Sequence, residues 1–325
     1  MKDGLEASLP AASGYYLRLS VTSACDLRCR YCRPGPPSPR RRTAPPPGDD
    51  EIVALAAAVA QAAPVRKVRL TGGEPLLRPG IARIVRGLRQ RLPGAVLAMT
   101  TNGQRLAPLA AELRRAGLDA VNVSLDTLDP MRFARVTPAG RLEATLAGID
   151  AAARVGFSPL KINTVLMRSV NASELDRLVR FAADRGAEIR FIELMPIGAG
   201  APLFRREFLS AGEARRRLAS AFEDRGPLGR SGTAGRWLFR VGGRDVAVGF
   251  ISPVSAPFCD GCDRLRLDSQ GRLLRCLRGE DGIDLLEPLR RGDTAAISEI
   301  VRDVLALKDR PATSWPRRTM IAVGG

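Results

Sequence analysis

Short apolar segments alternate with amphipathic segments through the first two thirds of the chain. The apolar segments have the length and the β-branched content of buried strands, and the segments between them have a helical period. The predicted strands are Tyr15–Val21, Lys67–Thr71, Val96–Thr100, Ala120–Leu125, Leu160–Leu166 and Ile189–Leu194. The predicted helices lie near Glu51–Ala62, Gly80–Leu92, Leu106–Ala116, Leu142–Val155 and Ser173–Arg185. Strand followed by helix, repeated in this way, predicts a parallel sheet with right-handed crossovers.

This alternation predicts an α/β fold, and its length favours a partial (β/α)6 barrel of the TIM type over residues 1–195. A chain of 325 residues would also accommodate two smaller domains. In barrels of this type the chemistry lies at the C-terminal ends of the strands. The loops that follow the predicted strands are therefore expected to hold the functional residues.

The alternation stops near Leu194, and a Gly- and Pro-bearing linker is predicted at Pro196–Ala201. Residues 196–325 are expected to form a smaller C-terminal α+β extension packed on the barrel. Its predicted helices lie near Ala211–Phe222, Leu285–Arg290 and Thr294–Leu307. Its predicted strands are Arg236–Val241, Asp245–Ile251 and Arg264–Leu267. A second irregular segment, Arg33–Asp50, is rich in Pro and Arg and is predicted to be a loop.

The chain is strongly basic, with a formal net charge of +17, and almost all of the positive charge is arginine. The lysines are Lys2, Lys67, Lys161 and Lys308. The arginine excess accompanies many Ala, Gly and Pro residues, which indicates a coding bias, but it also suits an anionic partner such as a nucleotide polyphosphate or a nucleic acid. Histidine is absent from the sequence, which excludes a Ser–His–Asp triad, a His-ligated zinc and a His general base.

No apolar run approaches the roughly 20 residues that a membrane-spanning helix needs. The first ten residues contain acidic side chains and lack the apolar core of a signal peptide. We therefore expect a cytoplasmic protein with no membrane partner.

All six cysteines fall into two trios, which are Cys25, Cys29 and Cys32 in the spacing C-x3-C-x2-C, and Cys259, Cys262 and Cys276. Three disulfides are one alternative, but a reducing cytosol disfavours them. Zinc is another alternative, but each trio lacks a fourth Cys or His ligand. Thiolates at this spacing suit three corners of a 4Fe–4S cluster, which leaves one iron open to bind a substrate or cofactor. Two trios therefore suggest two chemically active clusters.

The setting of the first trio is also informative. It follows directly on the first predicted strand, and Tyr31 stands between its last two cysteines, where an aromatic ring can pack beside an adenine. The next predicted strand ends in Gly-Gly-Glu-Pro at residues 72–75. These glycines permit a close backbone approach, and Glu74 can pair with an amino group.

The pattern C-x3-C-x-aromatic-C followed by Gly-Gly-Glu-Pro resembles the radical S-adenosylmethionine (SAM) superfamily. The segment Phe258–Arg266 around Cys259 and Cys262, the pair Cys276–Leu277 and the terminal Gly-Gly narrow this resemblance to the GTP 3′,8-cyclases of molybdenum cofactor biosynthesis, the MoaA family. The resemblance extends from about Tyr15 to Gly325.

The resemblance implies that the first trio ligates a 4Fe–4S cluster that binds SAM. It also implies that the second trio, in the extension, ligates an auxiliary 4Fe–4S cluster that meets the purine of GTP. The residues implied around SAM are Tyr31, Gly73, Glu74, Ser124 and Met195. The residues implied to bind GTP are Arg18, Arg69, Thr100, Lys161, Arg264 and Arg266, mostly cations that suit phosphate oxygens. The tail residues Gly324 and Gly325 are implied to reach the active site and take part in catalysis.

The implied activity is that of a radical SAM lyase in the first step of molybdenum cofactor biosynthesis. It would convert GTP to (8S)-3′,8-cyclo-7,8-dihydroguanosine 5′-triphosphate while SAM is cleaved to 5′-deoxyadenosine and methionine. The implied partners are a reductant and a downstream cyclic pyranopterin monophosphate synthase of the MoaC type, and a homodimer is left open. The departures from the family pattern are Asp263, where Asn is expected, and Arg33, where an apolar residue is expected.

Two alternatives remain beside the cyclase. One is a different radical SAM enzyme with an auxiliary cluster, such as a peptide-modifying maturase, although these usually have more C-terminal cysteines. The other is a basic protein that binds nucleic acid through iron–sulfur or zinc modules. Aromatic residues make up only 5% of the chain and no nucleic-acid motif is evident, so we expect no nucleic-acid partner.

Overall fold

Six parallel strands form the inner part of the sheet. The computed structural model describes residues 14–32, 45–259, 261–279, 282–308, 315–316 and 320. The strands are β1 (Tyr15–Ser20), β2 (Val65–Thr71), β3 (Val96–Thr101), β4 (Ala120–Ser124), β5 (Leu160–Leu166) and β6 (Glu188–Glu193). Each pairs in parallel with the next, which confirms the six predicted strands with small shifts at their ends.

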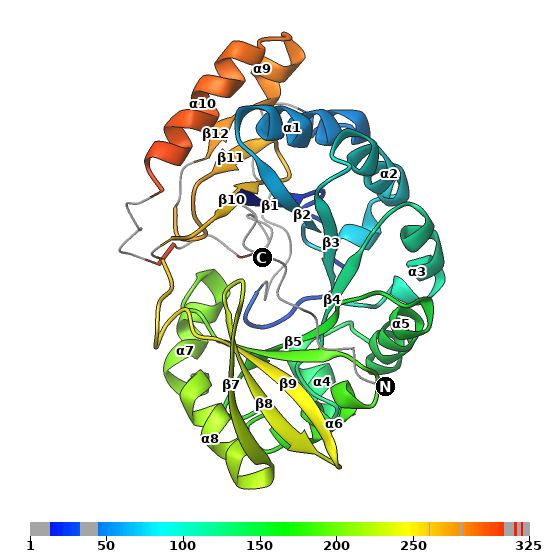
Figure 1. The fold of residues 1–325 in the computed structure, drawn as a ribbon, viewed down its shortest axis with the longest axis vertical. Coiled ribbons are helices and arrows are strands. Elements are labelled where there is room, and N and C mark those ends of the chain that lie inside the picture. The colour runs from blue at the N-terminus through cyan, green and yellow to red at the C-terminus, as the bar shows by residue number, and fades with distance from the viewer. Residues whose placement is uncertain are drawn as a thin grey trace.

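Helices connect the successive strands and cover the outer face of the sheet (Figure 1). They are α1 (Asp49–Ala62), α2 (Ile81–Arg91), α3 (Leu106–Arg115), α5 (Leu142–Val155) and α6 (Leu175–Ala183), with a short 3-10 turn η1 (Pro75–Leu77) after β2. Because α1 begins at Asp49, the predicted loop Arg33–Asp50 ends slightly earlier than expected, and its residues 33–44 lie outside the described part. Among the described helices, none has both the length and the apolar character of a membrane span.

One short helix after β4 was not predicted, α4 (Pro130–Val136). Its N-cap is Asp129, whose carboxylate accepts a hydrogen bond from the Arg132 backbone N–H at 2.9 Å. Pro130 stands at the first helical position, where its missing N–H costs nothing. The helix has only seven residues, too few to show a helical period in the sequence.

The alternation of side chains in β1 shows how the sheet separates its two faces. Leu17 and Leu19 are fully buried in the apolar core, together with Ile52 of α1. Tyr16 and Arg18 lie on the other face, because successive side chains of a strand point in opposite directions. Burying each leucine stabilises the fold by roughly 2 kcal/mol. Because the leucines are buried between the sheet and the helices, the alternate side chains of β1 must lie on the inner face.

The residues that follow β6 extend the sheet beyond that strand. They form η2 (Gly198–Gly200), α7 (Ala201–Glu207), α8 (Ala211–Ala221), β7 (Glu223–Ser231), β8 (Ala234–Val241) and β9 (Arg244–Ile251). Strand β9 pairs in parallel with β6, and β8 and β7 add antiparallel pairings. The predicted linker Pro196–Ala201 therefore contains η2 and the start of α7. Strand β7 was not predicted, because it is polar and contains Pro227, features typical of an edge strand.

The last part of the chain extends the sheet at its other end. Strand β10 (Arg264–Leu267) pairs in parallel with β1, and the short strands β11 (Arg272–Leu274) and β12 (Ile283–Asp284) follow antiparallel. Helices α9 (Leu286–Arg290) and α10 (Thr294–Ala306) come next, and both pack against α1.

Across the described residues, one twelve-stranded sheet therefore runs in the order β12-β11-β10-β1-β2-β3-β4-β5-β6-β9-β8-β7. The sheet does not close, which confirms the predicted partial barrel. The extension does more than pack on the barrel, because it lengthens the same sheet at both ends, and the parallel run reaches from β10 to β9. The chain between Ile251 and Arg264 connects these two strands.

Candidate active site at the barrel mouth

The loop that follows β1 contains the first cysteine trio. All three thiols are partly buried. The Cys32 backbone N–H donates to the Cys29 carbonyl at 2.9 Å, which folds the loop back on itself. Burial raises the pKa of Cys29 well above its usual range, and the nearby Cys32, Asp126 and Cys25 add to this rise. The three side chains of the trio are therefore close enough to interact electrostatically.

The Gly-Gly pair after β2 lies directly against this loop. The Gly73 N–H donates to the Thr22 carbonyl at 2.8 Å, and the Glu74 N–H donates to the Ala24 carbonyl at 2.8 Å. A Cβ atom at Gly73 would lie 2.1 Å from the Ala24 carbonyl oxygen and 3.0 Å from the Cys25 Cβ. Only glycine fits there, so the end of β2 determines where the cysteine loop lies.

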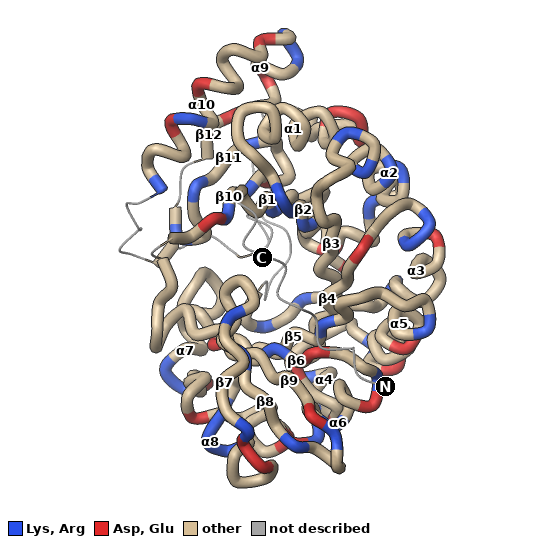
Figure 2. Tube along the Cα trace, in the orientation of Figure 1, with Lys and Arg blue, Asp and Glu red and all other residues tan. Residues whose placement is uncertain are grey.

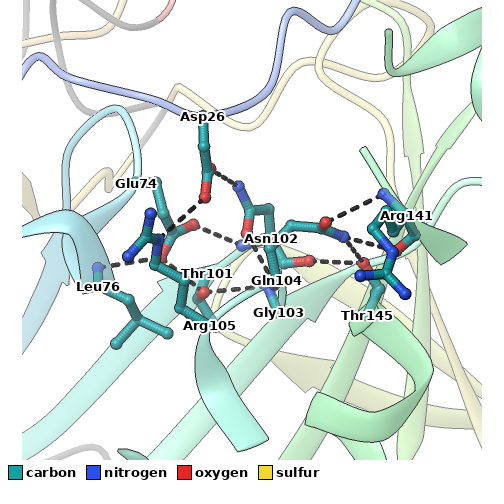
Figure 3. A network of polar contacts seen from close by, with 10 residues as sticks. All are labelled: Asp26, Glu74, Leu76, Thr101, Asn102, Gly103, Gln104, Arg105, Arg141 and Thr145. Carbon is teal, nitrogen blue, oxygen red and sulfur yellow. Dashed lines mark hydrogen bonds and ion pairs between the residues drawn. The ribbon is translucent and has the colours of Figure 1, made fainter. Parts of the chain in front are cut away.

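Glu74 connects the ends of β2 and β3. Its buried carboxylate accepts hydrogen bonds from the Leu76 N–H at 3.0 Å, the Thr101 hydroxyl at 2.7 Å and the Asn102 N–H at 2.7 Å (Figure 3). Burial raises the pKa of Glu74 to about 7, although these hydrogen bonds oppose the rise. Glu74 therefore stabilises the turns that follow β2 and β3 at the C-terminal edge of the sheet.

The same network continues into the cysteine loop through Asp26. Its carboxylate accepts a hydrogen bond from the Asn102 side-chain amide at 2.8 Å and pairs with Arg105 at 3.4 Å (Figure 3). The turn after β3 therefore also holds the loop that follows β1. Neither Asp26 nor Asn102 was singled out from the sequence, because a single polar residue after a strand is common.

Tyr31 links the cysteine loop to the far side of the barrel mouth. Its phenolic O–H donates to Asp126 Oδ2 at 2.8 Å, and Asp126 Oδ1 accepts from the Val165 N–H at 2.9 Å. Burial raises the pKa of Asp126 to about 6. Asp126 was also missed from the sequence, and its place directly after β4 is the signal that could have found it.

The structure also brings Met195 near Tyr31. A Cβ atom at Gly200 would lie 2.5 Å from the Met195 carbonyl oxygen and 3.4 Å from the Tyr31 carbonyl oxygen. Ser124 ends β4 beside Asn163 of β5. The residues implied around SAM thus all lie at C-terminal strand ends or in the loops beyond them.

Basic residues line the inner face where β10, β1 and β2 run side by side, and Figure 2 marks Lys and Arg positions in blue along these strands. Arg18 is in register with Arg69 on one side and with Arg266 on the other. Arg69 donates from Nη1 to the Thr100 hydroxyl at 3.1 Å. Lys161 lies farther along the sheet on β5 and is buried, as are Arg69 and Arg266.

The electrostatics of this lining favour a polyanion. Burial lowers the pKa of Arg18, and the charges of Arg69 and Arg264 lower it further. Burial lowers the pKa of Arg266 well below its usual range, with Arg18 and Arg264 adding to the effect. Burial is the largest cause of both lowered pKa values, and the like charges that add to it would be offset by a bound anion.

Two further residues belong to this lining and were missed from the sequence. Burial lowers the pKa of Lys67 to about 8, and the charges of Arg69 and Arg190 contribute to that shift. The Tyr16 hydroxyl accepts a hydrogen bond from Arg69 Nε. Period-two spacing along β1 and β2 is the signal that could have found Tyr16 and Lys67, because they precede Arg18 and Arg69 by two positions.

The second cysteine trio flanks strands β10 and β11. The Cys262 N–H donates to the Cys259 carbonyl at 3.1 Å, and the Arg278 N–H donates to Cys276 Sγ at 3.3 Å. Lys308 Nζ donates to the carbonyls of Arg264 and Arg275, and its charge interacts with those of Cys262 and Cys276. Burial opposes ionisation of Cys262, but Arg264 and Lys308 lower its pKa. A cationic surrounding of this kind favours the thiolate form that iron binds.

Among the described residues, we find no group of three His, Cys, Asp or Glu side chains that is arranged to hold a metal ion. The donor sets themselves are the type that 4Fe–4S clusters take, because each consists of soft thiols from one region of the chain. The residues present therefore fit two clusters by their chemistry.

Asp263, which departs from the family pattern, pairs with Arg66 of β2. The Asp263 carbonyl also accepts a hydrogen bond from the Tyr16 N–H at 2.8 Å. These contacts fasten the loop of the second trio to the first two strands of the barrel. Arg33, the other departure, lies outside the described residues.

Glu193, at the end of β6, binds the segment of chain that leads to the second trio. Its fully buried carboxylate accepts from the backbone N–H groups of Ala211 at 2.9 Å, Val254 at 3.0 Å and Ser255 at 2.9 Å. The Ser255 hydroxyl donates to it as well. One carboxylate thus holds the start of α8 and the segment that leads from β9 to Cys259.

The tail residues Gly324 and Gly325 lie outside the described residues. Closer to the helices, the Arg278 guanidinium stacks 3.7 Å from the centroid of the Trp315 ring. The Pro316 carbonyl accepts a hydrogen bond from the Gly198 N–H at 3.4 Å. This part of the C-terminal segment therefore lies between the second trio and the loop after β6.

Family models and curated relatives of this chain point to the same family. Residues 19–182 match the Radical SAM superfamily, and residues 187–313 match the family described as Molybdenum Cofactor Synthesis C. A protein of Peptoclostridium acidaminophilum named GTP 3′,8-cyclase is 38% identical over 315 residues, which are 95% of each chain. GTP 3′,8-cyclase 1 of Pseudomonas aeruginosa is 44% identical over 277 residues, covering 85% of this chain and 83% of the relative.

A solved structure supports the fold. Streptococcus suis SuiB bound to S-adenosylmethionine superposes with a TM-score of 0.64 at 15% identity, over 85% of this chain and 65% of that one. At this identity the likeness concerns the arrangement of strands and helices alone.

Proposed function

Since this chain belongs to the GTP 3′,8-cyclase family of the radical SAM superfamily, we propose that it converts GTP to (8S)-3′,8-cyclo-7,8-dihydroguanosine 5′-triphosphate, with SAM cleaved to 5′-deoxyadenosine and methionine. This is the first step of molybdenum cofactor biosynthesis. Identities of 38% and 44% to relatives named for this activity, over most of the chain, favour it over a peptide-modifying maturase.

Cys25, Cys29 and Cys32 would hold the 4Fe–4S cluster that binds SAM. When bound, this cluster supplies the one-electron chemistry that cleaves SAM. The chain provides the surroundings, since Gly73 positions the loop and Tyr31 anchors it to Asp126. Tyr31, Gly73, Glu74, Ser124 and Met195 would surround SAM at the strand ends.

The observation that supports GTP as the substrate is the basic lining of the inner face. A triphosphate carries about four negative charges, and guanidinium forks suit its oxygens. The lining includes β10, which lies between Cys262 and Cys276 of the second trio, so phosphates and purine could be held at the same time. Arg18, Arg69, Thr100, Lys161, Arg264 and Arg266 would bind GTP.

The second trio would hold an auxiliary 4Fe–4S cluster beside the purine. Residues 1–195 would then act as the SAM-cleaving barrel, and residues 196–325 would supply the auxiliary cluster. The buried lining would keep water from the reacting atoms and hold the two reactants in attack geometry. Gly324 and Gly325 would complete the site. In the cytoplasm a reductant would supply electrons, and a cyclic pyranopterin monophosphate synthase would take the product.

Metal analysis and product analysis together test this proposal. Protein reconstituted without oxygen should contain about eight irons per chain. It should form 5′-deoxyadenosine and a cyclised nucleotide from SAM and GTP. A triple variant of Cys259, Cys262 and Cys276 to Ser should keep about four irons and still cleave SAM, but leave GTP unchanged.

The matching triple variant of Cys25, Cys29 and Cys32 to Ser should lose SAM cleavage and keep the other cluster. Zinc in place of iron would contradict the proposal. Deoxyadenosine formed equally well without GTP, with the nucleotide unchanged, would contradict it too.

A further inference from the structure

Tyr16 lies among the cations of the inner lining. It is in register with Lys67 of β2 and with Arg264 of β10. Its hydroxyl accepts a hydrogen bond from Arg69 Nε. Lys67 Nζ lies 5.6 Å from the centroid of its ring, and the guanidinium carbon of Arg69 lies 5.8 Å from it. The phenol is thus an oxygen acceptor placed among groups that mostly donate.

The charged groups that face Tyr16 come from three strands. They are Arg18 on its own strand, Lys67 and Arg69 on β2, and Arg264 and Arg266 on β10. Burial by itself would raise the pKa of Tyr16, but the cations of Arg69, Arg18 and Lys67 outweigh it and lower this pKa to about 7. The free site therefore contains a partly ionised phenol whose charge offsets part of the surrounding positive charge.

We propose that Tyr16 is a positioning residue of the nucleotide site, an internal counter-anion that takes up one proton when phosphates bind to the lining. This inference rests on the proposed binding of GTP. Phosphate oxygens beside Arg18 and Arg69 would repel a phenolate and neutralise the cations that stabilise it. One proton then passes from solvent to Tyr16 Oη. The neutral phenol can donate a hydrogen bond to a phosphate oxygen, whereas in the free site it accepts one from Arg69.

The sign of the pH effect follows from this exchange. Above pH 7 the free protein contains the phenolate, so GTP binding requires protonation of Tyr16. The exchange at Tyr16 alone should therefore lower the affinity for GTP as pH rises, by at most about tenfold per pH unit. Lys67 titrates in the same range, with a pKa of about 8, and would add its own proton uptake. The substitution Lys67→Arg keeps the positive charge and removes this second source.

Titration calorimetry of the cluster-loaded protein tests the inference. GTP is added at pH 8 without SAM or reductant, in buffers of different ionisation enthalpy, so that binding is measured without reaction. At pH 8 the phosphates are already ionised, since their second pKa is near 6. The Lys67→Arg protein should take up more than roughly half a proton per GTP. The double variant Lys67→Arg, Tyr16→Phe should take up far less.

The matched control is Tyr15→Phe in the same Lys67→Arg protein, because Tyr15 precedes Tyr16 and points to the other face of β1. It should keep the proton uptake. Equal uptake with and without the Tyr16 hydroxyl would overturn the inference, while failure of the unsubstituted protein to bind GTP would instead overturn the proposed function. If Tyr16→Phe does not fold, 3-fluorotyrosine at this position gives a second measurement. Its more acidic phenol should increase proton uptake at pH 7, and unchanged uptake would overturn the inference.

Discussion

Tyr31 and Asp126 are 95 positions apart in the chain, yet the Tyr31 hydroxyl lies 2.8 Å from Asp126 Oδ2. This hydrogen bond joins the cysteine loop after β1 to the loop after β4. Asp126 in turn accepts the Val165 N–H of β5. The first trio is therefore attached both to its neighbour β2, through Gly73 and Glu74, and to the opposite part of the barrel mouth.

The substitution Tyr31→Phe should loosen this attachment. It removes the hydrogen bond to the buried Asp126 carboxylate, and we expect the free energy of unfolding to fall by about 1–2 kcal/mol. Iron should also leave the first trio faster in the presence of a chelator. A double-mutant cycle with Asp126→Asn, measured by urea unfolding, should give a coupling of roughly 1 kcal/mol. Strictly additive effects would show that the two side chains act independently.

The substitution Gly73→Ala should displace the cysteine loop. The added Cβ would meet the Ala24 carbonyl oxygen at 2.1 Å, and backbone cannot move aside as a side-chain tip can. We expect the iron content to fall from about eight to about four atoms per chain, with SAM cleavage lost. Gly94→Ala is the control, because a Cβ at Gly94 meets nothing within 4 Å. Full iron content in the Gly73 variant would contradict the prediction.

Glu74 should make stability depend on pH in a defined direction. Burial raises its pKa from 4.5 to about 7, so the folded protein binds this proton more tightly than the unfolded chain does. Its contribution is present in full below pH 4.5 and is lost as pH rises through 7. Glu74→Gln cannot titrate, so the difference in unfolding free energy between wild type and variant should change by about 3 kcal/mol across this range. Urea unfolding followed by circular dichroism measures it, with exposed Glu112→Gln as the control.

The substitution Ser255→Ala tests the role of Glu193. It removes one hydroxyl donor from the buried carboxylate, while the backbone donors of Val254 and Ser255 remain. We expect a loss of about 1 kcal/mol in unfolding free energy and faster release of iron from the second trio. Ser298→Ala on α10 removes an exposed hydroxyl hydrogen bond of 2.9 Å and should change neither quantity. Equal iron release from the two variants would refute a role for Glu193 in holding the second trio.

Much of the barrel could be predicted because its signals are local. Apolar segments of strand length, separated by helical periods, suffice to place β1 to β6 and the helices between them. Successive side chains of a strand point to opposite faces, so Arg18 and Arg69 must lie on the face opposite the apolar one, which is the inner face. The spacing of Cys25, Cys29 and Cys32 is local as well.

What was missed depends on contacts between distant segments. Strand β7 is polar and bears Pro227, so only its pairing with β8 identifies it as a strand. The parallel pairing of β9 with β6 and of β10 with β1 has no signature in either strand alone. Asp126 and Glu193 are single acids after or at strand ends, and their importance comes from burial and from hydrogen bonds to remote backbone groups.

The open sheet has a mechanical consequence. The parallel strands end at β9 on one side and at β10 on the other, and these two strands do not pair with each other. The distance between them therefore depends on the chain that connects them. Here the span is the peptide between Ile251 and Arg264, which also bears Cys259 and Cys262. The cluster proposed for these thiols would therefore also hold this connecting segment in one conformation. Its loss would let β9 and β10 move apart, and with them the cations of the inner face.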